Sequence, residues 1–374
     1  MRERATDEEL MARALALADR ARGLTSPNPV VGAVVVGAGE VVGEGFHRAA
    51  GGRHAEIEAL AAAGPRARGA TLYVTLEPCV HHGRTPPCVP VVIASGVRRV
   101  VVAATDPNPL VAGRGFQALR QAGLDVAGGV LETEAERQNR AFFTAMRLGR
   151  PHVTLKAAVT LDGRLADVHG ASQWISGEVA RRHAHRLRAE SDAVVVGVET
   201  VLRDDPRLTV RLDPPWPREP YRVVLDSRCR TPAGARLIGD ATAARALVAV
   251  TGAASPDAIR ALEAGGATVL RLATRGGRID LAALLGELSG REVRGVLVEG
   301  GGEVHAAFLD AGLVDRVAVF VAPRLLGGRE APSMVAGAGR ALKDAVRLGP
   351  FDITRLGDDL LLEADVLHDE PRRA

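Results

Sequence analysis

The sequence predicts two α/β domains in one chain, and three observations carry this prediction. The chain has 374 residues, which is longer than a single hydrophobic core usually organises. Patterns typical of strands and helices alternate along it, with Gly or Pro at most junctions. Gly149, Arg150 and Pro151 then interrupt the pattern, and strands restart after them. We therefore expect one domain over residues 1–148 and a second over residues 149–374, each built from α/β layers.

In the first domain, hydrophobic periodicity predicts helices over about 7–22, 54–63, 87–95, 115–122 and 132–147. It predicts strands over about 30–36, 41–46, 70–76, 98–104 and 125–130. The apolar runs are strand-sized, far below the roughly 18 residues that a membrane helix needs. The N-terminus is charged and amphipathic, so it does not resemble a signal peptide. We expect no membrane association.

The second domain continues the alternation as far as Val366, and its clearest elements are three strands and a helix. The strands are expected at His152–Ala158, Arg222–Asp226 and Val296–Glu299, and the helix at Glu178–Glu190. Prolines cluster between residues 214 and 220, which we interpret as a surface loop.

Composition restricts the function. Lysine and arginine exceed aspartate and glutamate by three, and no long basic run occurs. Aromatic residues make up 3% of the chain, so stacking platforms for nucleic-acid bases are scarce. This balance suits anionic small molecules better than nucleic acid. Three cysteines cannot all pair within one chain, which favours a reducing cytoplasm.

The most specific pattern is a histidine followed by two cysteines. His54 precedes Glu56 by two residues, a Pro-Cys pair ends at Cys79, and eight residues separate Cys79 from Cys88. One histidine and two cysteines form a catalytic zinc set, because the fourth tetrahedral position stays open to water. Zinc lowers the pKa of that water, and Glu56 would carry the proton. We predict one zinc ion per chain, held by His54, Cys79 and Cys88, with Glu56 as the catalytic residue.

Helix geometry adds a condition to this site. Residues two apart on a helix do not share a face, so His54 and Glu56 work together only at a helix start. Gly51 and Gly52 just upstream make that start plausible, and a second start is expected near Pro87. Helix N-termini there would stabilise the thiolates.

Plainer interpretations apply to the same residue types. Two buried thiols and a core histidine without metal would explain each ligand singly, but not their joint spacing. His81 and His82 fit surface-loop histidines, and Cys229 fits a core or exposed thiol.

A glycine turn marks a second candidate site. The strand Val296–Glu299 is followed by Gly300–Gly302 and then by an apolar-periodic helix. Such glycines let backbone N–H groups approach a pyrophosphate at a helix N-terminus, although many such clusters are plain loops. The segment lacks G-x-G-x-x-G and lies late in the domain, so it is not a Rossmann fingerprint and implies a different dinucleotide fold.

Longer motifs then point to a family. H-x-E with a later Pro-Cys pair resembles zinc-dependent base deaminases, with a longer second spacing here. The segment Thr75–Cys88 resembles the bifunctional deaminase–reductase family of riboflavin biosynthesis almost letter for letter, and Pro27–Ala33 and Asp106–Pro109 fit the same resemblance. Leu155–Arg164 and Ser172–Ser176 resemble its reductase half. The resemblance runs from about Asp7 to about Val366.

For the first domain, the resemblance implies a cytidine-deaminase-like α/β/α fold with a pyrimidine pocket. Asn28 looks like a contact to the base edge. The contacts to the sugar phosphate look like His47, Arg84, Asp106 and Asn108.

For the second domain, the resemblance implies a dihydrofolate-reductase-like α/β fold that binds NADPH. The implied cofactor contacts are Ala158, Trp174, Thr200, Asp204, Ser227, Gly301, Gly302, Glu303, Val304, His305, Ala306 and Ala307. The implied substrate contacts are Ser172, Arg188, Leu208, Arg211 and Glu299. Arg228 beside Ser227 offers a cation for the 2′-phosphate of NADPH. Taken singly, Trp174 would fit a partly buried packing residue and Arg188 a solvent-exposed helix face. Their order in the sequence around Ser172, Thr200 and Glu299 favours contacts to cofactor and substrate instead.

The family implies deamination of 2,5-diamino-6-ribosylamino-4(3H)-pyrimidinone 5′-phosphate, followed by NADPH-dependent reduction of the ribosyl group. The partners expected are these small molecules, without nucleic acid, and a homo-oligomer. A nucleic-acid deaminase with a binding module is the alternative, disfavoured by two Trp and two Tyr. A third interpretation is a structural zinc site followed by a small-molecule sensor domain. It is disfavoured because structural zinc sites are usually closed by a fourth Cys or His ligand. The sequence names no proton donor for the reduction.

Overall fold

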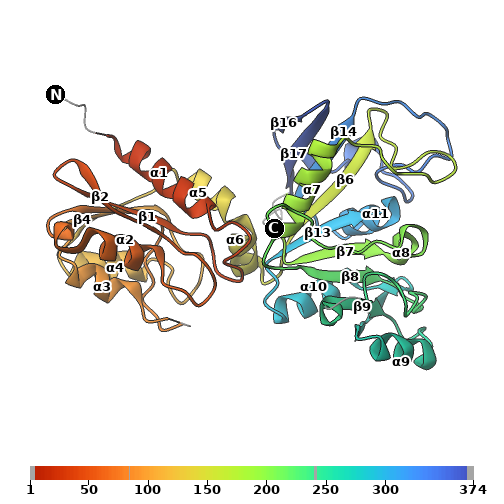
Figure 1. The fold of residues 1–374 in the computed structure, drawn as a ribbon, viewed down its shortest axis with the longest axis horizontal. Helices are drawn as coiled ribbons and strands as arrows, with labels where there is room; N and C mark the ends of the chain where they lie inside the picture. Colours follow the sequence, from red (N-terminus) through yellow and green to blue (C-terminus); the bar gives the residue numbers. More distant parts are fainter. Residues whose placement is uncertain (1–4, 84, 240–241, 369–374) are drawn as a thin grey trace. The chain divides into compact units, whose positions relative to one another are not determined.

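We describe a computed structural model of the chain over residues 5–83, 85–239 and 242–368. The chain forms two compact units, Met1–Arg150 and Pro151–Ala374, coloured red to yellow and yellow to blue in Figure 1. Within the described ranges, no helix is long and apolar enough to cross a membrane.

The first unit is a five-stranded sheet between two layers of helices. The strands lie in the order β2 (Glu40–Phe46), β1 (Gly32–Gly37), β3 (Thr71–Leu76), β4 (Arg99–Ala104), β5 (Asp125–Gly128). The last three run parallel, and β1 is antiparallel to β2 and β3. The helices are α1 (Asp7–Asp19), α2 (Ala55–Ala63), α3 (Cys88–Ala94), α4 (Arg114–Gln121), α5 (Glu132–Gln138) and α6 (Arg140–Leu148).

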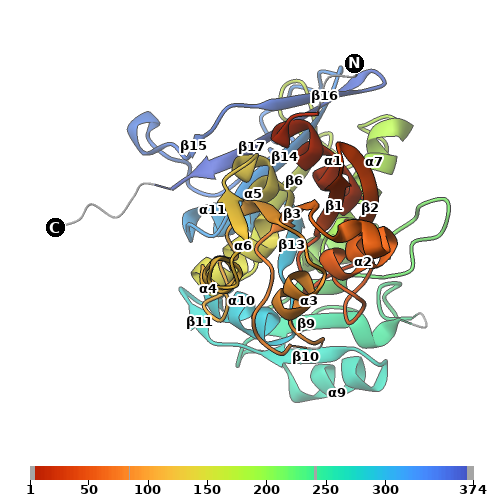
Figure 2. The ribbon, with the colours of Figure 1, turned by 90° about the vertical axis from the view of Figure 1, so that its left-hand side faces the viewer.

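Strand alternation gives this sheet two apolar faces. On β4, Val100 and Val102 pack with α2, α3 and α4, whereas Val101 and Ala103 pack with α1, α5 and α6. Figure 1 shows α1 and α5 on one side of the sheet and α2, α3 and α4 on the other. Helices α2 and α3 are neighbours in this layer (Figure 2).

Two glycines allow α2 to lie close to β2. A Cβ on Gly45 would lie 2.5 Å from the Ala59 nitrogen and 2.6 Å from the Ala55 oxygen. A Cβ on Gly43 would lie 2.2 Å from the Ala59 oxygen. Only glycine fits at these positions without a shift of the helix backbone. The start of α2 is therefore set by the sheet beneath it.

The predicted elements of this unit are present, with two differences. Helix α1 ends at Asp19 rather than near residue 22, and the helix expected over about 132–147 is divided at Asn139. The Asn139 side chain accepts a hydrogen bond from the Val30 nitrogen at 2.8 Å and donates one to the Val30 oxygen at 2.9 Å. This buried side chain pairs with a distant backbone segment, which helical periodicity does not reveal.

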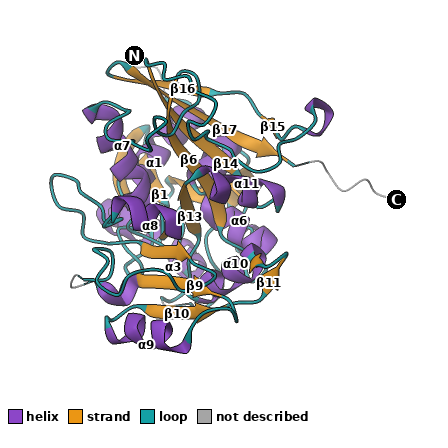
Figure 3. Ribbon diagram, turned by 90° about the vertical axis from the view of Figure 1, so that its right-hand side faces the viewer, coloured by secondary structure: helices purple, strands orange, loops and turns teal. Residues whose placement is uncertain are grey.

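The second unit is a long, mainly parallel sheet with helices on both faces. Its strands lie in the order β10 (Thr268–Arg271), β9 (Ala246–Val250), β8 (Tyr221–Leu225), β7 (Ala193–Gly197), β13 (Gly295–Gly300), β6 (His152–Thr160), β14 (Arg316–Ala322), β17 (Asp359–Leu367), β15 (Arg347–Leu348). Strands β10 to β14 in this order are parallel, and β17 is antiparallel to β14. The helices are α7 (Glu178–Glu190), α8 (Val198–Asp204), α9 (Pro256–Ala264), α10 (Leu281–Gly290) and α11 (Gly302–Asp310). Figure 3 faces this unit, with α9 beside the edge strand β10.

Two hairpins of this unit were not predicted. One consists of β11 (Thr274–Arg275) and β12 (Arg278–Ile279), and the other pairs β16 (Asp352–Leu356) with β17. Strands of two residues show no periodicity, and β16 is mostly exposed, so neither has a clear apolar pattern.

Candidate active sites

Three predicted metal ligands meet in the first unit. Atoms of His54, Cys79 and Cys88 all lie within 4.8 Å of one another. The His54 Nδ1 atom is 3.2 Å from the Cys88 sulfur and 3.7 Å from the Cys79 sulfur. Ligand atoms of a tetrahedral zinc with bonds of about 2.0–2.3 Å are roughly 3.5 Å apart, so the geometry fits zinc.

The ligands come from two helix starts and one loop. His54 is the N-cap of α2, and Cys88 is the first residue of α3. The Cys88 nitrogen donates a hydrogen bond of 3.3 Å to the Cys79 sulfur. Such a bond stabilises a thiolate at Cys79.

Glu56 lies in the first turn of α2, beside the ligands. Its side chain is buried, and burial raises the pKa of its carboxyl group. A raised pKa makes a carboxyl group a stronger proton acceptor, which suits general acid and base catalysis. The helix start therefore places His54 and Glu56 together, which mid-helix geometry would not allow.

Two further residues fix this centre, and sequence reasoning gave neither a role. The Thr85 hydroxyl is 3.1 Å from His54 Nε2, so it orients the imidazole. The buried Glu77 carboxylate accepts hydrogen bonds from four backbone nitrogens, those of Asp106, Gly113, Gly115 and Phe116. It ties the loop after β4 to the segment that carries Cys79. In the sequence, Glu77 directly follows a predicted strand and precedes the Pro-Cys pair, and this position could have marked it as a site residue.

Asn28 and His47 are brought together next to His54. Asn28 Nδ2 is 3.1 Å from His47 Nε2, and His47 Nδ1 is 3.0 Å from the Arg53 oxygen. The His47 and His54 rings meet edge to face with centroids 5.3 Å apart. Burial lowers the pKa of His47, so its neutral form donates to Arg53 and accepts from Asn28.

Asp106 and Asn108 lie in one turn after β4. The Asn108 nitrogen donates to Asp106 Oδ1 at 2.8 Å, and burial raises the pKa of Asp106 to about 6. The Asn108 side-chain oxygen accepts from the Leu110 nitrogen at 3.0 Å. Arg84, the predicted phosphate contact, lies outside the described residues.

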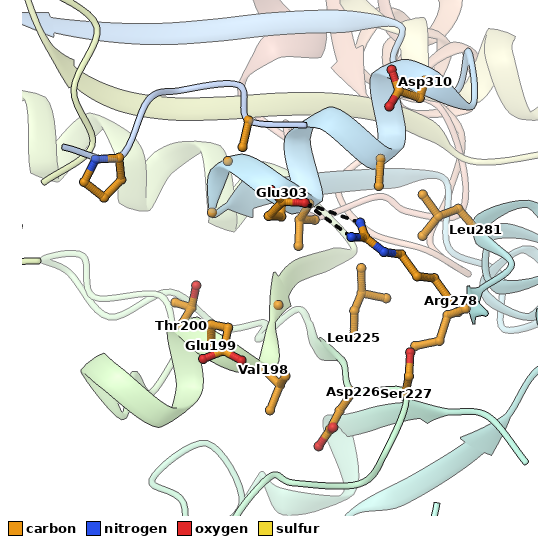
Figure 4. Close-up of a pocket in the computed structure, with 18 of the residues that line it drawn as sticks. Val198, Glu199, Thr200, Leu225, Asp226, Ser227, Arg278, Leu281, Glu303 and Asp310 are labelled. Carbon is orange, nitrogen blue, oxygen red and sulfur yellow. Dashed lines mark hydrogen bonds and ion pairs between the residues drawn. The ribbon is translucent and has the colours of Figure 1, made fainter. Parts of the chain in front are cut away.

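The second unit contains a cavity of about 1170 Å³ at the carboxyl ends of β7, β8 and β13. Figure 4 shows its walls, with Thr200 from α8, Ser227 after β8 and Glu303 on α11. The predicted cofactor contacts that line it are Thr200, Asp204, Ser227, Arg228, Gly301, Gly302, Glu303, Val304 and Ala307. The size suits a dinucleotide.

Gly301 is the N-cap of α11, and a Cβ on it would meet nothing within 4 Å. A phosphate can therefore reach the backbone N–H groups of the helix start. His305 and Ala306 are buried and do not line the cavity. The His305 Nδ1 atom is instead 2.8 Å from the Met334 oxygen.

A second cavity of about 1040 Å³ lies beside β6, α7 and the end of β13. The predicted contacts that line it include Ala158, Trp174, Ser172, Arg188, Leu208, Arg211 and Glu299. Ser172, Thr200, Asp204 and Gly301 line both cavities, so the two spaces adjoin. Trp174 is 58% exposed, and the Arg181 guanidinium lies 4.5 Å from its ring centroid.

Glu299 organises the charge of the second cavity. Arg188 donates to both carboxylate oxygens, at 2.5 and 2.8 Å, and Lys156 Nζ lies 3.8 Å away. Burial raises the pKa of Glu299, but Arg188 and Lys156 outweigh it and lower this pKa to about 2. Burial lowers the pKa of Lys156. Sequence reasoning missed Lys156, although it lies in the quoted motif Leu155–Arg164.

Cations crowd one wall of this cavity. Burial and the charges of Arg188, Arg207 and Arg236 lower the pKa of Arg211. Arg211 also donates to His185 through its side chain, at 3.3 Å. The wall suits a phosphate, because guanidinium groups bind phosphate oxygens in pairs.

Comparisons with known proteins agree with both sites. Residues 4–104 match the cytidine and deoxycytidylate deaminase zinc-binding region, and residues 151–362 match the RibD C-terminal domain. The riboflavin biosynthesis protein RibD of Aquifex aeolicus is 44% identical over 359 residues, which cover 96% of this chain and 98% of that protein. RibD of Escherichia coli K12 is 44% identical over 370 residues, which cover 95% of this chain and 98% of that protein.

Solved structures of related proteins are similar to this chain over nearly its whole length. RibD of Acinetobacter baumannii, form 1, has a TM-score of 0.88 at 39% identity and covers 97% of this chain and 99% of its own. The Thermotoga maritima structure titled diaminohydroxyphosphoribosylaminopyrimidine deaminase/5-amino-6-(5-phosphoribosylamino)uracil reductase has a TM-score of 0.83 at 36% identity, covering 96% and 99%.

The fold and sites thus define a zinc-binding deaminase domain joined to a reductase domain. The chain belongs to the RibD family of riboflavin biosynthesis proteins, and it is a bifunctional deaminase and reductase with zinc and NADPH as cofactors. The predicted fold class, cytidine-deaminase-like followed by dihydrofolate-reductase-like, is confirmed.

The zinc ligands give a direct prediction. Cys88→Ser should lower the zinc content well below one per chain and abolish deamination, because a hydroxyl is a poor ligand in place of a thiolate. Cys229→Ser, a buried thiol outside the cluster, is the matched control and should keep its zinc. Metal analysis of the purified variants checks this. Stoichiometric zinc and full deamination in Cys88→Ser would disprove the ligand assignment.

Proposed function

We propose that the first unit deaminates 2,5-diamino-6-ribosylamino-4(3H)-pyrimidinone 5′-phosphate. We propose that the second unit then reduces 5-amino-6-(5-phosphoribosylamino)uracil with NADPH. The observation that carries this proposal is the pairing of two unlike sites in one chain. One is a three-ligand metal centre beside a buried carboxyl group, and the other is a pair of adjoining cavities with a cationic wall. The Thermotoga maritima relative is named as both a deaminase and a reductase.

In the deaminase, Glu56 is the group that moves the proton. Zinc, when bound, supplies the Lewis acidity that makes water nucleophilic near neutral pH. Glu56 takes the proton of the attacking water and passes it to the amine, which leaves as ammonia. Thr85 holds the His54 ring, and Glu77 holds the loop that carries Asp106. We assign the pyrimidine edge to Asn28 and the sugar phosphate to the turn of Asp106 and Asn108, with Arg84.

In the reductase, the chain supplies position and charge. NADPH, when bound, supplies the hydride for C1′ of the sugar. We place its diphosphate at the start of α11 and its nicotinamide where Ser172, Thr200 and Gly301 border both cavities. We infer that Lys156 holds the proton that the reduced sugar takes up, because it lines the second cavity and burial lowers its pKa.

The phosphate of the substrate is assigned to the cationic wall of the second cavity. Arg207, Arg211 and Arg236 line the second cavity, and the charges of Arg207, Arg236 and Arg188 all act on Arg211. A phosphomonoester would relieve the repulsion among these guanidinium groups. This supports a small anionic substrate, and we propose no nucleic-acid partner.

We place the enzyme in the cytoplasm, because the thiols of Cys79, Cys88 and Cys229 are free and zinc ligation needs them reduced. Cell fractionation checks this placement.

We also propose a homo-oligomer formed through the apolar surface of β16 and β17. Ile353 on β16 is 65% exposed, and Leu360 on β17 and Phe351 just before β16 are exposed as well. Exposed apolar side chains on a sheet edge favour association. Light scattering should give the mass of two or more chains, each of 39.2 kDa. A mass of one chain at micromolar concentration would contradict this proposal.

The function is tested with the purified protein and the diaminopyrimidine phosphate. Ammonia should be released without NADPH, and addition of NADPH should oxidise one equivalent of cofactor per ammonia. A single-stranded oligonucleotide should release no ammonia. Release from the oligonucleotide and not from the free pyrimidine would favour a nucleic-acid deaminase and overturn the proposal.

A further inference from the structure

The hairpin of β11 and β12 forms a wall of the first cavity that no motif predicted. Arg275, Gly277, Arg278 and Ile279 line the cavity from this hairpin. Gly276 and Gly277 have positive φ angles of 60° and 75°, which allow the tight turn between the strands. Gly301, Gly302 and Glu303, at the start of α11 where a diphosphate would bind, line the same cavity.

The base of the hairpin is firmly anchored. Ile279 is buried in the same apolar cluster as Leu281, and Leu225 at the end of β8 and Val304 on α11 pack against that cluster. The Asp280 nitrogen donates to the Ala273 oxygen at 2.9 Å. The Asp280 side chain caps α10 by accepting from two backbone nitrogens. The backbone of Arg278 is therefore fixed by the anchored residues Ile279 and Asp280 that follow it and by its strand pairing with Arg275.

From this base the Arg278 side chain extends toward α11. Its two terminal nitrogens lie 3.4 and 3.5 Å from Glu303 Oε2, and Figure 4 shows this pair with Leu225 and Leu281 nearby. The Arg278 and Glu303 side chains are 70% and 62% exposed. An ion pair of such length and exposure is weak, so Arg278 can change partners at little cost.

Glu303 occupies a position that suits an anion. It lies in the first turn of α11, where the helix dipole and free N–H groups attract negative charge. A phosphate carries three acceptor oxygens and binds guanidinium in a fork, so it competes well with one carboxylate oxygen for Arg278.

Two other acids of this cavity, Asp226 and Asp280, are held by groups of the fold, whereas Glu199 and Asp310 form ion pairs with Arg230 and Arg340. Asp226 accepts hydrogen bonds from the Thr231 nitrogen and hydroxyl, at 2.6 and 2.7 Å. Asp280 caps α10 as described. The Asp226 and Asp280 carboxylates are thus fixed, whereas the Arg278–Glu303 pair joins two exposed side chains that both line the cavity.

We propose that Arg278 is a cofactor-binding residue that exchanges Glu303 for a phosphate group of the bound dinucleotide. This inference rests on the proposed reductase function. The phosphate is either the diphosphate at the start of α11 or the 2′-phosphate near Ser227, and the two share this chemistry.

The test compares Arg278→Gln and Glu303→Gln with the full-length wild type. Titration with NADPH should show a Kd about tenfold higher for Arg278→Gln, because a charge-assisted bond is lost. The Kd should fall about threefold for Glu303→Gln, because a competing carboxylate is removed. Arg260→Gln, which breaks an exposed pair with Asp257 on α9, is the matched control and should bind as the wild type does. Equal melting temperatures would show that the variants fold.

Titrations with NADH, ADP and adenosine 2′,5′-bisphosphate distinguish the two phosphates. If Arg278→Gln raises the Kd of NADPH and of NADH equally, the result supports a contact to the diphosphate. If it raises the Kd of NADPH and the bisphosphate alone, the result supports a contact to the 2′-phosphate. An unchanged Kd in Arg278→Gln, or weaker NADPH binding in Glu303→Gln, would overturn the inference. If the wild type itself bound no NADPH, the proposed reductase function would fail instead.

Discussion

The close contact between helix α2 and strand β2 is the constraint on which the deaminase site depends. Without Cβ atoms at Gly43 and Gly45, the helix lies directly on the sheet, and its first turn is held at one position. That turn carries both His54 and Glu56. A metal centre needs its ligands placed to within a few tenths of an ångström, so rigid support beneath the ligand-bearing helix matters as much as the ligands.

In the reductase, a buried carboxylate has the corresponding role. Glu299 at the end of β13 joins Arg188 on α7 and Lys156 on β6. Removing one partner of such a buried group leaves an uncompensated charge, which is strongly destabilising. The same ion pairs set the charge of the second cavity, so packing and chemistry depend on the same residues. The glycine turn that follows Glu299 leads directly to the start of α11, where the first cavity begins.

The sequence predicted what local patterns encode. Alternating apolar residues predicted the sheet of the first unit, and the spacing of His54, Cys79 and Cys88 predicted ligands that the fold brings within 4.8 Å. The motif around Gly301 predicted a helix start that lines a cavity. Partners far apart in the chain were not predictable in this way. The bond of Asn139 to Val30, the four amides on Glu77 and the reach of Arg278 to Glu303 depend on tertiary packing, which leaves no periodic trace in the sequence.

The central claim is that one chain holds two chemically separate sites, and Glu56→Gln tests it most directly. This variant should keep one zinc per chain, because Glu56 is not a ligand, and it should lose ammonia release by about 10²-fold or more. It should still oxidise NADPH when supplied with the deaminated intermediate. Glu58→Gln on the same helix is the matched control and should retain both activities. Loss of zinc, or loss of both activities together in Glu56→Gln, would contradict the account.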